Sequence, residues 1–506
     1  MKRTIFSFFL FLVLTVVAAA QKTPAAQKAP APVAPLPLPK QVEWQKMETY
    51  AFVHYGLNTF NDSEWGYGDA DPKTFNPSRM DVEQWVRTFK QAGMKGVIIV
   101  AKHHDGFTMW PSPLTDYNIT RSSYDGPKNK DGKVDVLAEL RKACDKYGLK
   151  MGVYLSPWDR NHAEYGRQAY VEYYHKQLTD LVTNYGPLFE VWLDGANGGD
   201  GYYGGAREKR KIDRRNYYDF PKIHAIIEEH QPNAIIFSDG GPGCRWVGNE
   251  RGMAGIPNWS FLRAKEVYPG YPKNRELETG HPDGDTWIPA ECDVSIRPGW
   301  FYHPKEDSKV KTPEQLAELY YTSVGRNATF LLNFPIDREG RVHAIDSTNA
   351  VRFRQIIERD MKTNLLRKAK VTASSERGKL FSARKLNDGK WDTYWATPDG
   401  VTTGFVTFTF PKPTQVNQIL LQEYIPLGQR VGRFVVEALA DGEWREVNAG
   451  EATPDGQWES QPFGNIGYKR IVRFATIETT ALRVSFYESR GPLCINNIEA
   501  YCCPNR

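Results

Sequence analysis

Cysteine is scarce in this chain of 506 residues, because only six are present and none forms a C-x-x-C pair. So few cysteines cannot make a disulfide scaffold for a chain of this length, and the missing pair spacing excludes the common zinc and redox motifs. We interpret them as structural thiols. One disulfide among Cys494, Cys502 and Cys503 stays open, since connectivity does not follow from sequence alone.

An excess of charge of one sign and a membrane-spanning apolar run are also missing. Lys and Arg number 65 against 60 Asp and Glu, a balance of +5 without a basic tract, which gives no indication of nucleic-acid binding. The apolar run at residues 5–17 is too short to span a membrane. It follows Lys2 and Arg3 and precedes three alanines, which is the pattern of an export signal. We therefore expect a signal peptide over residues 1–20 and a periplasmic or secreted protein.

The composition separates a linker from the folded part of the chain. Residues 21–42 are dominated by Ala, Pro and Lys, which cannot bury a core, so we predict an extended, solvated linker there. The whole chain is 41% hydrophobic, which is enough for more than one ordered domain. Its aromatic content of 13% suits stacking on sugar rings, although ordinary core packing accounts for most of these side chains.

Between residues 43 and 362, short apolar runs alternate with longer helical patterns, which favours parallel strands joined by crossover helices. We predict an α/β fold, a (β/α)8-type barrel whose eighth strand is hidden in the irregular stretch 252–283. A doubly wound open sheet is the alternative. The predicted strands are 51–57, 96–101, 151–155, 189–193, 234–238, 286–290 and 328–334, and the predicted helices include 80–92, 134–146, 170–184, 217–230 and 313–324.

Polar side chains follow the first four of these strands where each strand ends. In a (β/α)8 barrel the chemistry gathers at these carboxyl ends. The fourth strand leads into Trp192-Leu193-Asp194-Gly195, so a lone carboxylate follows an apolar strand. Such an aspartate is as often a turn or helix-capping residue, but the agreement of four strand ends favours a site. The other strand-end residues are His54, Tyr55 and Asn58, then Lys102, His103, His104 and Asp105, then Ser156, Trp158 and Asp159.

Four blocks of this sequence resemble the α-L-fucosidases of glycoside hydrolase family 29, over roughly residues 43–342. They are His54-Tyr55-Gly56, Ser63-Glu64-Trp65, Lys102 to Phe107, and Trp192 to Gly195. The resemblance implies a retaining exo-glycosidase that requires no cofactor and acts on fucosylated glycans, with Asp194 as nucleophile. The predicted substrate contacts are His54, Glu64, Trp65, His103, His104, Tyr154, Trp192, Arg245 and Trp300.

The chemistry of retention gives separate reasons for these residue types. It needs a carboxylate nucleophile and a carboxylic acid about 5 Å apart on either side of the glycosidic bond. A neutral imidazole offers one donor and one acceptor, so neighbouring histidines can bind adjacent sugar hydroxyls. A metal at His103 and His104 is disfavoured, because adjacent strand residues point to opposite faces and no H-E-x-x-H spacing is present.

Three carboxylates compete for the role of acid/base: Asp239, Glu250 and Glu291. Residues 238–250 resemble the branch of the family that prefers α-1,3 and α-1,4 linkages, in which the Glu of a Gly-Asn-Glu turn is the proton donor. That Glu corresponds to Glu250, whose carboxyl Trp246 could desolvate and keep protonated. Asp239 is more plausible as a turn residue, and Glu291, which follows another predicted strand, is the runner-up.

After Lys362 the pattern changes to short alternating runs separated by Gly, Pro and Asp, which predicts an antiparallel β-sandwich. Residues 383–395 and 493–501 resemble discoidin-like modules, also called coagulation-factor C-type modules. Some relatives of that module bind sugars, and some hold a structural calcium, which Asp388 and Asp392 could ligate here. A role as a structural support for the barrel is equally open.

These patterns divide the chain into a signal peptide (1–20), a linker (21–42), a (β/α)8-type catalytic domain (43–365) and a discoidin-like β-sandwich (366–506). Two other functions stay open at this point. One is a different retaining exo-glycosidase, and the other is a carbohydrate-binding protein on a barrel that has lost its activity. The intact pair of Asp194 and Glu250 favours the enzyme.

Overall fold

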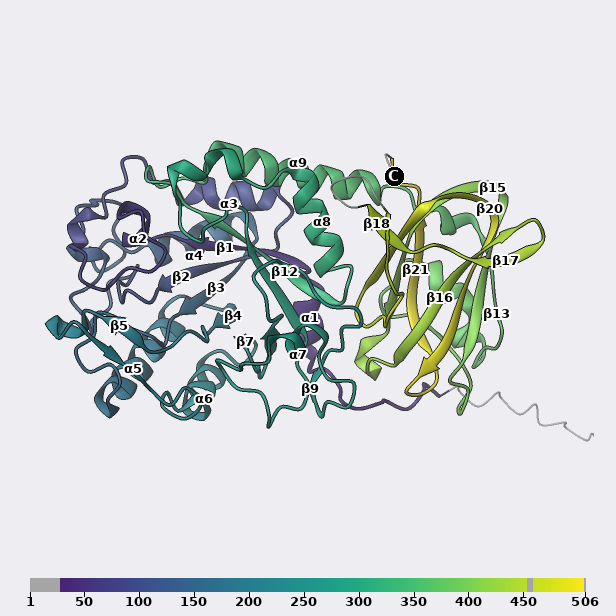
Figure 1. Ribbon diagram of the computed structural model, residues 1–506, viewed down its shortest axis with the longest axis horizontal. Helices are drawn as coiled ribbons and strands as arrows, with labels where there is room; N and C mark the ends of the chain where they lie inside the picture. Colours follow the sequence, from purple (N-terminus) through teal and green to yellow (C-terminus); the bar gives the residue numbers. More distant parts are fainter. Residues whose placement is uncertain (1–27, 453–457, 505–506) are drawn as a thin grey trace, which may run out of the picture.

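The computed structural model describes residues 28–452 and 458–504, so the predicted signal peptide lies outside the described residues. Eight parallel strands close into a barrel in the order β1-β12-β11-β8-β7-β4-β3-β2, at the left of Figure 1. This closure confirms the predicted barrel and excludes the open sheet. The barrel strands are β1 (Thr49–His54), β2 (Gly96–Lys102), β3 (Lys150–Leu155), β4 (Leu188–Trp192), β7 (Ile235–Ser238), β8 (Cys244–Trp246), β11 (Ala290–Ser295) and β12 (Ala328–Pro335).

Helices cover the outside of the barrel, and capping side chains fix where several of them begin. Asp81, Asp135 and Asp219 each accept a hydrogen bond from a backbone N–H three residues further on. Thr312 and Gln315 form a reciprocal capping box. The long helices are α3 (Val82–Gln91), α4 (Val136–Tyr147), α5 (Gln168–Asn184), α6 (Phe220–His230), α8 (Pro313–Ser323) and α9 (Ala344–Asp360), and the short ones are α1 (Pro39–Gln45), α2 (Leu57–Phe60) and α7 (Asn274–Thr279).

Two barrel strands differ from the sequence prediction. The eighth strand is β8, which begins five residues after β7 with no helix between them, and it does not lie in the stretch 252–283. Three residues that include a buried arginine are too short and too polar to give a periodic signal. The strand predicted over 286–290 is in fact β11, a few residues later. Its inward residues Glu291, Asp293 and Ser295 are polar, so it lacks the apolar run that marks a buried strand. The short strands β9 (Phe261–Leu262) and β10 (Thr286–Trp287) pair outside the barrel.

The C-terminal domain, at the right of Figure 1, is built on antiparallel strands in the order β14-β21-β15-β20-β16-β17, with β13 paired to β15. It has a hydrophobic core of its own, while Leu420, Ile471 and Tyr501 pack with the core of the barrel. The antiparallel prediction is therefore confirmed. The strands are β13 (Lys370–Ala373), β14 (Trp395–Ala396), β15 (Gly404–Glu423), β16 (Val431–Ala440), β17 (Glu443–Glu446), β20 (Arg470–Ser489) and β21 (Cys494–Tyr501); small pairs elsewhere are β5 (Gly199–Gly201) with β6 (Glu208–Arg210) and β18 (Gly450–Ala452) with β19 (Trp458–Ser460).

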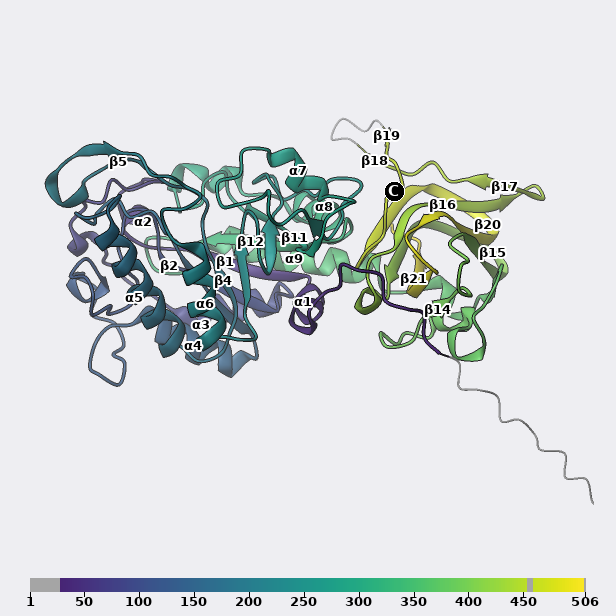
Figure 2. The same ribbon diagram turned by 90° about the horizontal axis from the view of Figure 1, so that it is seen from below.

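The described part of the predicted linker is bound to the C-terminal domain and is not a solvated tether. The Val33 amide donates to the Leu427 carbonyl at 3.0 Å, and Arg430 donates to the Ala31 carbonyl at 2.8 Å. Helix α1 begins at Pro39, inside the predicted linker. Figure 2 shows this segment running from α1 along the C-terminal domain. An extended proline-rich chain buries no core of its own, but its free carbonyls suit arginine donors on a neighbouring surface.

The barrel and the C-terminal domain are joined by buried polar contacts. The Tyr468 amide donates to the Asn327 side chain at 2.7 Å, and the Tyr468 hydroxyl donates to Glu48 at 2.9 Å. The Ser260 amide donates to Gln429 at 2.9 Å. These bonds tie the amino-terminal side of β1 and β12 to the second domain, and the opposite end of the barrel stays open for a site.

Two further sequence expectations can be compared with the described residues. No disulfide joins the cysteines of the described ranges, including the three near the C-terminus. Among the helices of the described ranges, none has the combination of length and apolar character that a membrane crossing needs.

Candidate active site

Inward side chains of the barrel strands stack in layers, since every second residue of a strand points to the same side. On β1 the inward residues are Tyr50, Phe52 and His54, from the amino to the carboxyl end. The ring of Trp192 on β4 lies 5.4 Å from Phe52 and 5.2 Å from Tyr154 on β3, and these three form an aromatic middle layer. The predicted site residues at the strand ends lie above this layer.

Asp194 lies two residues beyond β4, at the carboxyl end of the barrel. Its Oδ2 accepts the Tyr154 hydroxyl at 2.9 Å, and its Oδ1 accepts the Ala196 amide at 2.6 Å. The Nε2 atom of His104 is 3.9 Å from Oδ2, and the side chain keeps 22% of its surface exposed. The carboxylate is therefore held in place on one side and open to a ligand on the other.

Three histidines surround the same opening, and their partners define the tautomers of two of them. Asn333 uses its amide N–H groups on Ser295 and the Trp300 carbonyl, so its oxygen accepts from Nδ1–H of His54 at 2.9 Å. By the same logic Ser156 donates to the Trp158 carbonyl and accepts from Nδ1–H of His104 at 2.7 Å. Both Nε2 atoms are therefore free acceptors for sugar hydroxyls.

Burial keeps these imidazoles neutral. It lowers the pKa of His54 to about 3, and it also lowers the pKa of His103 and of His104. Asn58 lies 3.5 Å from Nδ1 of His103. Asn58, Ser156 and Asn333 were not predicted as site residues, although Asn58 and Ser156 stand among the strand-end residues. A polar Asn333 within the apolar run of β12 was the signal that could have identified the third.

Glu250 lies in the loop after β8, near the opening. The indole N–H of Trp300 donates to its Oε2 at 3.3 Å, and Trp300 also lies 5.2 Å from the His54 ring. Burial raises the pKa of Glu250, the Trp300 hydrogen bond opposes this shift, and the charges of Asp194 and Glu64 add to it. The structure thus brings the Glu250 carboxyl group close enough to feel the charge of Asp194. Its surroundings favour the protonated form of this group.

Glu64 holds the loop that carries Trp300. Its carboxylate accepts from the backbone N–H of Trp300 at 2.8 Å and of Phe301 at 3.1 Å, and it lies 2.6 Å from Nε2 of His303. The other ring nitrogen of His303 is 2.7 Å from Asp62. Burial alone would lower the pKa of His303, but hydrogen bonds to both carboxylates raise it. His303 and Asp62 had no motif in the sequence and were not predicted.

Trp65 stands at the rim and is the most exposed of the predicted substrate contacts, with 53% of its surface accessible. Its ring meets His104 edge to face at 5.3 Å and Trp158 at 5.6 Å. Trp65 is therefore one wall of the opening that contains Asp194. Tyr154 forms part of its floor.

The structure does not bring Arg245 to this opening, which corrects its prediction as a sugar contact. Arg245 is fully buried in β8, and its guanidinium donates to the carbonyls of Leu277 and Ile288 and to the Asn258 side chain. Each guanidinium nitrogen is thus bound by the protein, and Arg245 anchors the loops behind the site. The sequence could not distinguish this orientation, because the strand β8 was not recognised.

Glu291 does not lie in the opening either, so it is corrected as the runner-up acid/base. It is fully buried inside β11, below the aromatic layer, and its Oε1 accepts the Trp192 indole N–H at 2.8 Å. Trp192 is itself 6% exposed and forms part of the floor. Asp239 accepts the Gly270 amide, in agreement with a turn role, and burial raises its pKa to about 7.

A closed parallel barrel with two carboxyl groups, neutral histidines and aromatic walls at the carboxyl ends of its strands defines a hydrolase barrel of the glycosidase class. The chain matches the alpha-L-fucosidase family over residues 36–356 and the F5/8 type C domain over residues 370–488. The chain therefore belongs to the alpha-L-fucosidase family, glycoside hydrolase family 29, whose members are retaining hydrolases.

Several relatives are similar over almost the whole chain. Alpha-L-fucosidase 1 of Arabidopsis thaliana is 37% identical over 501 residues, 98% of this chain and 93% of the relative. A putative alpha-L-fucosidase structure from Bacteroides thetaiotaomicron is 38% identical with a TM-score of 0.82, covering 94% of this chain and 99% of that one. A family 29 fucosidase of Ruminococcus gnavus in complex with fucose is 32% identical with a TM-score of 0.81, covering 94% and 97%. The family match selects alpha-L-fucosidase activity over other retaining glycosidases and over a binding protein without activity.

Proposed function

We propose that this alpha-L-fucosidase removes terminal fucose by double displacement, with Asp194 as nucleophile and Glu250 as acid/base. The observation that carries the proposal is the pair of environments: Asp194 is fixed by two donors with an open face, whereas Glu250 has a raised pKa. One carboxyl group is thus suited to attack and the other to proton donation.

In the first step Asp194 forms a bond to the anomeric carbon of fucose as the glycosidic C–O bond breaks, and Glu250 gives its proton to the leaving oxygen. In the second step Glu250 takes a proton from water, whose oxygen attacks the same carbon and releases Asp194. Two inversions give net retention. The Nε2 atoms of His54 and His104 would accept hydrogen bonds from sugar hydroxyls, and Tyr154 would hold the Asp194 carboxylate during both steps.

Replacement of the acid/base tests this division of roles. Glu250→Ala should be slow on natural glycans and largely spared on aryl fucosides whose leaving group needs no proton. Azide should take the place of water in the second step and yield a fucosyl azide with the retained α configuration. The product is identified by proton NMR. If azide has no effect on Glu250→Ala, another group is the acid/base, and the buried Glu291 is not an alternative.

We further propose that the preferred substrates carry fucose in α-1,3 or α-1,4 linkage on a branched N-acetylglucosamine, as in Lewis-type epitopes. Support comes from the likeness of residues 238–250 to that branch of the family, together with the loop's position beside the opening. Asn249 donates to the Met253 carbonyl at 2.9 Å and to Glu278 at 3.0 Å, so the turn before Glu250 is fixed from behind. A rigid outer loop suits contacts with a second branch sugar.

Relative kcat/KM values test the linkage proposal. Lewis a and Lewis x trisaccharides should be cleaved far faster than α-1,2-linked fucosyl-galactose or an aryl fucoside, because the branch sugar adds contacts in the transition state. Equal values for all four substrates, or a preference for the α-1,2 linkage, contradict the linkage proposal without affecting the fucosidase activity.

Two smaller proposals complete the function. Export to the periplasm or the medium rests on the charged and apolar pattern of residues 1–20, and mass spectrometry of the secreted protein should find a mature chain that begins near Gln21.

A structural calcium could be ligated by Asp388 and Asp392 in the C-terminal domain. The Asp388 oxygens already accept from the Lys390 amide and the Thr393 hydroxyl, so the ion would have to share them.

A further inference from the structure

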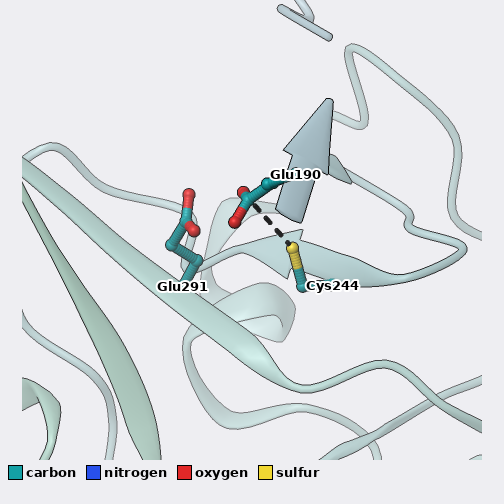
Figure 3. A group of neighbouring side chains, drawn as sticks. All are labelled: Glu190, Cys244 and Glu291. Atoms are coloured by element: carbon teal, nitrogen blue, oxygen red, sulfur yellow. Dashed lines mark hydrogen bonds between the residues drawn. The ribbon is translucent and has the colours of Figure 1, made fainter. Parts of the chain in front are cut away.

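Two glutamates lie side by side inside the barrel, one layer below the aromatic floor of the site. Glu190 comes from β4 and Glu291 from β11, and both are fully buried. A carboxylate oxygen of each and the Cys244 sulfur lie within 4.8 Å of one another. Figure 3 shows the Glu190 carboxyl between the Glu291 carboxyl and the Cys244 thiol.

Every oxygen of this pair has a donor among the surrounding side chains, which come from helix α1 and from barrel strands. Trp44 donates to Glu190 at 2.8 Å, and Cys244 lies 3.9 Å from the other Glu190 oxygen. Trp192 donates to Glu291 at 2.8 Å, and the Tyr50 hydroxyl donates to its second oxygen. Within the described part of the chain, no Lys or Arg forms an ion pair with either glutamate.

Two carboxylates this close in a low-dielectric interior cannot both be charged without a cation. Burial raises the pKa of both groups, and the second carboxyl raises the pKa of Glu190 further. The carboxylate oxygens that a metal ion would bind already accept hydrogen bonds from Trp and Tyr side chains. A proton shared by the two carboxylates is therefore the simpler way to remove one negative charge. The other titratable or charged groups around the pair are Tyr50, Cys244, Asp293 and Arg245.

A continuous set of contacts leads from this pair to the nucleophile. The Trp192 ring, whose N–H is fixed by Glu291, stacks on Tyr154 with centroids 5.2 Å apart and on Phe237 at 3.9 Å. The Tyr154 hydroxyl in turn donates to Asp194. The orientation of the indole plane therefore sets the height of the tyrosine hydroxyl below the carboxylate.

We propose that Glu190 and Glu291 hold one proton between them and act as positioning residues for catalysis, through Trp192 and Tyr154 to Asp194. Neither glutamate touches the substrate. The inference deepens the proposed function and rests on the role of Asp194 as nucleophile.

The first test separates positioning from mere stability. Glu291→Leu removes the acceptor of Trp192, so kcat for an aryl fucoside should fall about 10- to 100-fold while KM stays near the wild-type value. Glu291→Gln, whose amide oxygen can still accept from Trp192, should restore most of kcat. Glu423→Leu is the matched control, because Glu423 is fully buried in the C-terminal domain; it should lower Tm and leave kcat of the folded protein unchanged.

Trp192→Phe covers the case in which Glu291→Leu does not fold. It keeps a stacked ring, removes the same hydrogen bond from the other side, and should reduce kcat to a similar extent. Where Glu291→Leu does fold, the two changes combined should cost no more than Trp192→Phe alone, since both remove the same hydrogen bond. Wild-type kcat in Trp192→Phe, or fully additive losses, overturns the positioning role.

The second test concerns the proton. A group whose pKa is raised in the folded state stabilises the fold below its ordinary pKa, and this stabilisation is lost as the pH rises through the folded pKa. The Tm of the wild type should thus fall more steeply with rising pH than that of Glu190→Gln, in which the lone Glu291 keeps its donors. Equal slopes overturn the shared proton. The shared proton is also overturned if the purified wild type contains one equivalent of metal and the purified Glu190→Gln variant contains none.

The outcomes also distinguish this inference from the proposed function. If Asp194→Asn keeps its turnover, the nucleophile assignment fails. If Asp194→Asn is inactive while Glu291→Leu and Trp192→Phe both have wild-type kcat, only the positioning inference fails.

Discussion

Asp194 in the barrel and Glu423 in the C-terminal domain are both held by hydrogen-bond donors, but they differ in how much of the carboxylate is open to solvent. Asp194 in the barrel accepts from one hydroxyl and one amide and keeps 22% of its surface open. Glu423 in the C-terminal domain has no exposed surface and accepts from the backbone amides of Gly467, Arg430 and Val431. Burial raises the pKa of Glu423 to about 7, against these donors. A carboxylate enclosed by backbone amides fixes a turn, whereas one with an open face can react.

The largest expected effect sharpens this comparison. Asp194→Asn should reduce turnover about 10⁴-fold or more, because the amide is not a nucleophile, while Tm changes little. Glu423→Gln should do the reverse and lower Tm with near-normal turnover, since an amide N–H would face backbone donors. Initial rates on an aryl fucoside and a thermal melt of each variant measure both. Normal turnover by Asp194→Asn would remove it from the mechanism.

A smaller effect concerns the histidines. His54→Phe should weaken inhibition by fucose about 10-fold, because it removes one hydroxyl acceptor from the opening. Since burial lowers the pKa of His54 to about 3, the fucose inhibition constant of the wild type should stay flat between about pH 5 and pH 8.

The control for this variant is His224→Phe on α6, outside the site, where burial likewise lowers the pKa, to about 4. It should leave the inhibition constant unchanged. A break near pH 6.5 that is present in the wild type and absent from His54→Phe would show that His54 is charged and would contradict the acceptor role of its Nε2.

Much of the fold could be predicted because six barrel strands carry the apolar runs that burial on both faces requires. The two misplaced strands lack such runs, because β8 has three residues around a buried Arg245 that points to the loops outside the barrel, and β11 carries the inward Glu291. The bound amino-terminal segment was also missed. Its contacts are made by its own backbone amide and carbonyl groups, which composition does not reveal.

The site residues were predictable where a motif follows a strand directly, as at Asp194 and the three histidines. The supporting residues were not. Asn333, His303 and Glu190 bind other side chains that are between 146 and 279 positions away in sequence. These partners come together only when the barrel closes. Sequence patterns therefore identify the side chains that face the ligand and miss the side chains that position them.

The smallest expected effect lies in the C-terminal domain and involves no change in turnover. If Asp388 and the exposed Asp392 ligate calcium, millimolar calcium should raise Tm by about 2–4 °C over a sample in EDTA, and Asp392→Asn should abolish the rise. Asp392 is suited to this test because Asp388 also caps its own turn. Lys385 already places an ammonium 4.0 Å from Asp388. Identical Tm values in calcium and EDTA would contradict the calcium proposal. The Lys385 ammonium would then be the counter-charge of Asp388.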